Sequence, residues 1–149
     1  MEVLSAQQMR DVDHYAIHIL GIPSLALMEQ AGACAAASLQ RRFTPAGRTV
    51  YLFCGKGNNG GDGLVMARLL HRQGYHVKVI LTAEKERLSP DASAMYEKLV
   101  DCGVEPKLWE QWDKDTLNIE ETDIIVDALL GPGLSSNLRQ PHADLVSLI

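Results

Sequence analysis

The segment T-V-Y-L-F-C-G-K-G-N-N-G-G-D-G, from Thr49 to Gly63, joins a short apolar run to a run of glycines. The apolar run ends at Gly55 and does not alternate with polar residues, which is typical of a strand buried on both faces of a parallel sheet. A helical pattern follows from Leu64 to Gln73. This order predicts the first half of a βαβ unit, with the glycines between strand and helix.

The rest of the chain continues the same alternation of strands and helices. Caps and breakers mark its boundaries, among them a capping box at Ser5 and Gln8, an expected N-cap at Ser24 and a Ser-Pro helix start at Ser89. We expect helices over residues 5–20, 24–42, 64–73 and 89–103, strands over 49–54, 76–82, 104–109 and 123–130, and the start of a last helix at 143–149. This predicts a three-layer α/β/α, Rossmann-like, doubly wound and mainly parallel sheet. Its ligand site should lie where the first and fourth strands are neighbours.

Length, charge and cysteine content restrict the class of protein. The 149 residues suit one folded domain, residues 1–149, with 46% hydrophobic and 22% charged residues. A net charge of -5 opposes nonspecific binding to nucleic acid or anionic membranes, so neither is an expected partner. The three cysteines form no C-x-x-C pair, and we therefore expect a reducing, cytoplasmic compartment. No apolar run is long enough to predict a membrane span.

The glycine-rich segment is the strongest functional feature. Glycines permit positive φ and let backbone N–H groups approach a ligand, while a following helix start favours anions. Gly55, Gly57 and Gly60 satisfy G-x-G-x-x-G, a pattern that is weak by itself, and a simple glycine turn remains the alternative. Because no G-K-S or G-K-T follows, a Walker A loop is excluded. The segment predicts an anion cradle.

Two aspartates modify this prediction. Asp62 lies inside the cradle, where it would repel a pyrophosphate unless it caps the helix or meets a cation or a hydroxyl. Asp127 follows the apolar residues I-I-V at the end of the fourth strand, where it needs a partner. Either it is hydrogen-bonded to loop amides, or its oxygens join those of Asn58, Asn59 and Asp62 around a hard cation. Oxygen ligands alone disfavour zinc.

Several other side chains carry weaker signals, each with a plainer alternative. Glu84 could accept a hydrogen bond from a ribose hydroxyl or could be a solvated turn residue. Cys54 fits a buried apolar position better than a nucleophile, since no activating base is evident. Trp109 and Trp112 could form an interface or pack in the core. Arg139 could pair with a ligand phosphate or could be solvated.

Three motifs together carry a resemblance to a known family. N-N-G-G-D-G at 58–63, L-M-E-Q-A-G at 27–32 and V-D-A-L-L-G-P-G-L at 126–134 resemble the YjeF N-terminal domain family, in the right order and over nearly the whole chain. That family comprises the NAD(P)H-hydrate epimerases, found alone or fused to an ADP- or ATP-dependent dehydratase. The resemblance implies an isomerase that interconverts the R and S forms of hydrated NADH and NADPH (NADHX and NADPHX), so that a stereospecific dehydratase can repair both.

The resemblance also implies residue roles. Potassium would be held by Asn59 and Asp127. The implied substrate contacts are Asn58, Asn59, Gly60, Gly61 and Asp62, with Gly131, Pro132, Gly133, Leu134, Ser135, Ser136 and Asn137 against the phosphates. Epimerisation at a hemiaminal carbon requires acid–base help, and Asp127 or a carboxylate beyond this chain is the hypothetical base. The expected partner is the dehydratase, and a homodimer is also considered.

This chain departs from the family pattern in three places. Gln30 replaces the usual Asn, and Pro132 stands where Thr is common. The family continues into a strand carrying V-D-x-P-S-G, so we expect this chain to be truncated at its C-terminus. Two rival interpretations remain, an NAD-dependent oxidoreductase and a non-catalytic binding or dimerisation scaffold of the YjeF type. Asn59, Asp62 and Asp127 together favour the epimerase.

Overall fold

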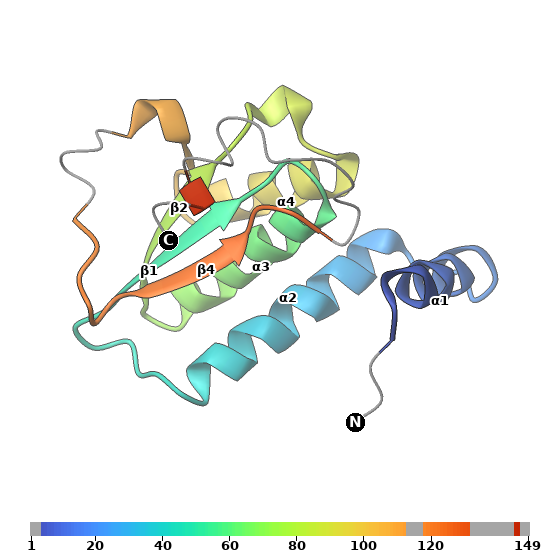
Figure 1. Ribbon diagram of the computed structural model, residues 1–149, viewed down its shortest axis with the longest axis horizontal. Helices are drawn as coiled ribbons and strands as arrows, with labels where there is room; N and C mark the ends of the chain where they lie inside the picture. The colour runs from blue at the N-terminus through green and yellow to red at the C-terminus, as the bar shows by residue number, and fades with distance from the viewer. Residues whose placement is uncertain (1–3, 113–117, 132–144, 147–149) are drawn as a thin grey trace.

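A parallel sheet forms the centre of the computed structural model, which describes residues 4–112, 118–131 and 145–146 (Figure 1). Within this part of the chain the strand order is β3-β2-β1-β4. The strands are β1 (Thr49–Cys54), β2 (His76–Leu81), β3 (Lys107–Leu108) and β4 (Ile124–Ala128). The chain builds outward from β1 to β3 and then returns to the other side of β1 with β4. This reversal confirms that the first and fourth strands are neighbours, and it creates the switch point where such sheets bind ligands.

The helices are α1 (Ala6–His18), α2 (Ser24–Gln40), α3 (Asn58–Arg72) and α4 (Pro90–Val100), with 3-10 turns η1 (Lys85–Arg87) and η2 (Trp109–Gln111). Local sequence explains several boundaries. Both hydrogen bonds of the capping box at Ser5 are present, and the Ser89 hydroxyl accepts from the Ala92 N–H at the start of α4. Gly74 and Gly103 follow α3 and α4 with φ of +85°, a conformation that favours glycine.

The core lies on both faces of the sheet, unevenly. Residues from α2, α3 and α4 pack on one face around fully buried side chains such as Leu52, Leu64 and Leu99. A smaller cluster on the other face contains Phe53, Trp109 and other residues. Figure 1 shows α1 beside the start of α2, away from the sheet. No helix in the described ranges is both long and apolar enough to span a membrane.

The structure corrects three expected boundaries. Helix α3 begins at Asn58 rather than Leu64, so the N-N-G-G-D-G motif is helical. Tertiary packing overrides the low helix propensity of its glycines. Ser24 is the first residue of α2 and does not cap it, because Pro23 occupies the N-cap position. Strand β3 covers two residues instead of six, since Pro106 has no N–H for a sheet ladder.

Strand β4 is not buried on both faces as expected. Ile125 and Asp127 are exposed, whereas Ala128 is buried against the helices. The residues after β4 fall mostly outside the described part of the chain. Of the predicted last helix, only Leu145 and Val146 are described; they are helical, and Leu145 is buried in the cluster that contains Phe53.

Candidate functional site

The glycines of the motif are packing residues. A Cβ at Gly60 would lie 1.8 Å from the Gly55 carbonyl oxygen, and one at Gly63 would lie 2.8 Å from the Cys54 Sγ. A Cβ at Gly61 would lie 2.5 Å from the Met28 Sδ. None of these glycines has a positive φ, so the expected loop cradle of positive-φ glycines is wrong. Their small size lets the first turns of α3 rest directly against β1, β4 and α2.

The other side of the same turns lines a cavity of about 160 Å³. Four helices contribute to it. The lining residues are Asp13 and Ile17 of α1, Ser24, Leu27, Met28 and Ala31 of α2, Asn58 and Asp62 of α3, and Asp91 of α4. One wall is therefore apolar and the rest is polar, with carboxylates from three different helices. The motif thus turns its glycines inward and two of its polar side chains, Asn58 and Asp62, toward the cavity.

The carboxyl group of Asp62 has a raised pKa in this cavity. Its pKa rises from 3.8 to about 6, first because the carboxyl is partly buried and second because the negative charge of Asp13 is near. A carboxyl group with this pKa changes its protonation close to neutral pH. Such groups serve as acids and bases in enzyme sites, so Asp62 is a candidate for proton transfer.

The start of α4 holds the start of α3 in place. The Ser89 hydroxyl donates to Asn58 Oδ1 over 3.1 Å, and the Ser89 N–H donates to the Lys56 carbonyl oxygen over 2.8 Å. The same hydroxyl caps α4 through the Ala92 N–H at 3.3 Å. Ser89 therefore fixes the Asn58 side chain relative to the cavity.

Asn59 faces a second region, at the carboxyl end of β4. Its Nδ2 donates to the Leu130 carbonyl oxygen over 3.1 Å, and its Cβ would lie 3.7 Å from a Cβ placed on Gly131. Nearby, the Gly55 N–H donates to the Ala128 carbonyl oxygen over 2.9 Å and ties the end of β1 to the end of β4. These contacts bring Asn59 and Gly131 together, as the predicted site requires.

Asp127 lies in the same region, and the structure shows the first of its two sequence-based alternatives, the bond to a loop amide. Its Oδ1 accepts from the Leu129 N–H over 3.0 Å, which is the expected bond to a loop amide, and the side chain is exposed. Strand alternation directs it to the sheet face opposite that of Val126, which packs beneath the helices. Asn59 and Asp127 therefore approach the end of β4 from different faces.

The donor atoms in this region suit a hard cation. The Asn59 amide nitrogen is used by Leu130, so its oxygen faces away from that bond as an acceptor. Asp127 adds an exposed carboxylate. In the part of the chain that the structure describes, no three His, Cys, Asp or Glu side chains gather as a metal site, so a cation here would depend on amide and carbonyl oxygens as well.

Six of the predicted phosphate-contacting residues, 132–137, and Arg139 lie outside the described residues. Among the weaker candidates, Cys54 is fully buried, and burial raises its pKa to about 12, which confirms its interpretation as a core residue. Trp109 and Trp112 pack in or against the cluster around Phe53, in agreement with the core alternative. Glu84 is exposed before η1.

Of the polar residues in and beside the cavity, sequence reasoning missed Asp13, Ser24, Ser89 and Asp91 as site residues. Ser89 and Asp91 could have been predicted near the site, because the helix that follows a parallel strand begins at the carboxyl edge of the sheet. Asp13 carried no signal, since the sequence does not show where α1 packs.

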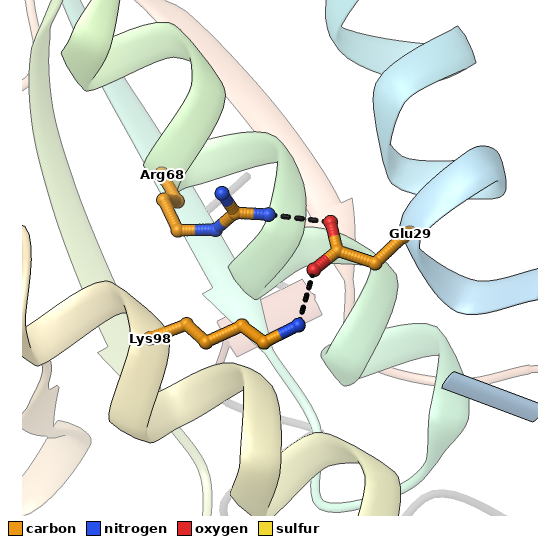
Figure 2. A network of polar contacts seen from close by, with 3 residues as sticks. All are labelled: Glu29, Arg68 and Lys98. Carbon is orange, nitrogen blue, oxygen red and sulfur yellow. Dashed lines mark hydrogen bonds and ion pairs between the residues drawn. The ribbon is translucent and has the colours of Figure 1, made fainter. Parts of the chain in front are cut away.

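A network of charged side chains behind the cavity was also missed. Figure 2 shows Glu29 of α2 between Arg68 of α3 and Lys98 of α4. One Glu29 oxygen pairs with Arg68, and the other accepts from the Lys98 Nζ over 2.7 Å. Arg68 is largely buried, while Lys98 is exposed. The network joins the three helices that cover the sheet.

Comparisons with known proteins agree with this geometry. The bifunctional NAD(P)H-hydrate repair enzyme Nnr of Salinibacter ruber is 40% identical, over 99% of this chain and 29% of that enzyme. The NAD(P)H-hydrate epimerase of Limosilactobacillus reuteri is 32% identical, over 99% of this chain and 67% of that protein. The crystal structure of yeast YNL200c has a TM-score of 0.86 and 27% identity, covering 99% of this chain and 64% of that one.

The chain thus spans less than a third of the bifunctional relative and about two thirds of the single epimerase. Residues 24–149 match the family model described as YjeF-related protein N-terminus, so helix α1 precedes the matched region. Both the motifs and the fold agree with that match, and the chain belongs to the YjeF N-terminal domain family.

Proposed function

We propose that this chain is an isomerase domain that interconverts the R and S forms of NADHX and NADPHX. The observation that carries the proposal is the position of the N-N-G-G-D-G motif. It forms the first turns of α3 at the switch point between β1 and β4, with Asn58 and Asp62 on a cavity and Asn59 beside Gly131. Relatives that bear the name NAD(P)H-hydrate epimerase support the same activity.

The substrate diphosphate would lie on the Gly131 side of the motif. Three carboxylates line the cavity, and they would repel a phosphate placed among them. The N-terminus of α3 lies between the two regions, and within the described residues no side chain caps it at Gly57, so its first N–H groups would be available to an anion. The segment from Gly131 to Asn137 would complete the phosphate contacts.

Potassium is part of the proposal. Asn59 and Asp127 would hold it through an amide oxygen and a carboxylate, which are ligands of hard cations. Bound there, the ion would offset the negative charge of the phosphates. Asp127 also remains the proposed base of the reaction, because its carboxylate is exposed at the end of β4.

The proposed functional partner is an NAD(P)H-hydrate dehydratase, either fused or separate. The bifunctional relatives are named repair enzymes and are much longer than this chain, which supports a second activity in those proteins. The cytoplasm is the proposed compartment, on the ground that Cys34, Cys54 and Cys102 are all free thiols. A homodimer stays a prediction.

The direct test is epimer interconversion of chemically prepared NADHX and NADPHX, with and without potassium, followed by chromatography of the R and S forms. We expect acceleration above the spontaneous rate, with potassium increasing it. A protein that binds NADHX without accelerating the exchange would instead favour the scaffold interpretation.

Asp127→Asn separates the two roles of that residue. If Asp127 is the base, turnover is lost while NADHX still binds and potassium still has its effect on binding. If it is only a potassium ligand, the variant loses the potassium dependence and keeps the potassium-free rate. An unchanged rate and unchanged potassium response would remove both roles.

A further inference from the structure

The charge of the cavity restricts what it can bind. Asp13, Asp62 and Asp91 supply three carboxylates, and among the residues that the structure describes no Lys or Arg lines the cavity. A neutral group that becomes positive during a reaction would be stabilised there, whereas an anion would be repelled. The apolar wall formed by Ile17 and Leu27 suits a flat ring.

The proposed substrate has such a group, and this inference rests on the proposed function. The hydrated nicotinamide carbon carries a hydroxyl and is bonded to the ring nitrogen. When that hydroxyl accepts a proton, the C–O bond breaks and water leaves, and the nitrogen lone pair forms a C=N bond in a cationic ring. Water then adds to the opposite face, the C–O bond reforms, the electron pair returns to nitrogen, and the added water gives up one proton.

We propose that Asp62 delivers this proton to the leaving hydroxyl, while the proposed base Asp127 accepts the proton that the added water gives up. Asp62 then regains a proton from solvent, and Asp13 on α1 is the positioning residue that keeps Asp62 protonated often enough to act as the acid. Asp62 and Asp13 face the same cavity from different helices. Asp91 faces it from α4, and α2 contributes Ser24 but no charged side chain. Every charged group that the described residues contribute to the lining is thus a carboxylate, which favours the protonated form of Asp62 and the cationic ring alike.

The titration of Asp62 agrees with this geometry. Burial is the first cause that raises its pKa to about 6, and the Asp13 charge is the second. Without Asp13, burial alone would remain, and the pKa would move part of the way back toward 3.8. Helix α1 lies before the region that matches the family model, so Asp13 adds to the site from outside that region.

The test compares the pH profile of epimerisation in the wild-type protein, Asp13→Asn and Asp11→Asn. Asp11 is the matched control: it is exposed on the same helix, accepts from Gln7 Nε2 over 2.8 Å and does not line the cavity. In Asp13→Asn we expect the inflection due to Asp62 to move to lower pH and the rate at pH 7 to 8 to fall about threefold to tenfold. Asp11→Asn should keep the wild-type profile, and Asp13→Glu should restore most of it.

A second measurement needs no substrate. The Asp62 carboxyl carbon is titrated by NMR in the wild-type protein and in Asp13→Asn, and we expect a lower pKa in the variant. An unmoved inflection and an unmoved NMR titration would overturn the role of Asp13. Full activity in Asp62→Asn would overturn the role of Asp62.

The outcomes also separate this inference from the proposed function. If the wild-type protein does not accelerate the exchange, the proposed function fails and the proton transfer by Asp62 fails with it, whatever the NMR titration shows. If the wild-type protein does accelerate it and Asp13→Asn keeps the wild-type profile, only the present inference fails.

Discussion

The first turns of α3 have two sides, and they obey different physical rules. On the inner side, Gly60 and Gly63 touch backbone and side chains so closely that no Cβ would fit. On the outer side, Asn58 and Asp62 face open space, where charge and hydrogen bonding decide what can bind. The inner side is sensitive to volume and the outer side to charge. In this motif the glycines therefore indicate close packing, while the polar residues indicate which ligands can bind.

Gly60→Ala is the largest expected effect on the inner side. The added Cβ would meet the Gly55 carbonyl oxygen at 1.8 Å, so either β1 or α3 must shift. We expect the free energy of unfolding to fall by more than about 3 kcal/mol, although alanine is ordinarily the better helix former. Urea unfolding followed by circular dichroism measures the change.

Gly57→Ala is the matched control, because no atom lies within 4 Å of its added Cβ and Gly57 already has a negative φ. It should cost about 1 kcal/mol or less, since alanine is a poor N-cap. Equal stability losses in the two variants would contradict the division into two sides.

The network behind the cavity gives a second, smaller effect on the inner side. Glu29→Ala would leave Arg68 largely buried without its carboxylate, which should cost about 2 to 4 kcal/mol in the free energy of unfolding. Lys98→Ala removes an exposed partner of the same carboxylate and should cost about 0.5 kcal/mol or less. Chemical unfolding of both variants tests the difference. A loss as large for Lys98→Ala as for Glu29→Ala would show that burial does not set the strength of these pairs.

Local patterns in the sequence were sufficient to predict most of the fold. The limits of β1 at Thr49 and Cys54 were predicted correctly, because an apolar run that ends at glycine is a strong strand signal. The capping box at Ser5 and the Ser-Pro start of α4 were also confirmed. From these elements, the neighbouring position of the first and fourth strands followed from the rules of doubly wound sheets.

What could not be predicted depends on contacts between distant segments. The helical start at Asn58 has no apolar periodicity, and only the contact of its glycines with β1, β4 and α2 explains it. The exposure of Asp127 follows from what covers β4, which no residue in that strand encodes. Asp13 lies 49 positions before Asp62, and no spacing rule links them. The sequence predicted Asn58 and Asp62 as site residues, but it did not predict which residues of other helices line the cavity with them.

Asp62→Asn has a small expected effect on stability and tests the outer side. The folded-state pKa of about 6 lies above the ordinary 3.8, so folding favours the protonated carboxyl. The contribution of this group to stability is therefore fully present below about pH 4 and is lost as the pH rises to about 6. A neutral amide avoids that loss, and the variant should melt higher than the wild-type protein above pH 6 and equally near pH 4. Because Asp62 is only half-buried, solvent screens the effect, and we expect a gain on the order of 2 °C.

Melting temperatures of Asp62→Asn, Asp13→Asn and the wild-type protein between pH 4 and pH 8 measure this difference. Asp13→Asn should give a smaller gain of the same sign, because it removes the second cause of the raised pKa and leaves the first, burial, in place. A gain in Asp62→Asn that does not change with pH would mean that the amide packs better and that charge is not responsible. A lower melting temperature above pH 6 would mean that the ionised carboxylate stabilises the fold, and the outer side would then follow the same packing rule as the inner one.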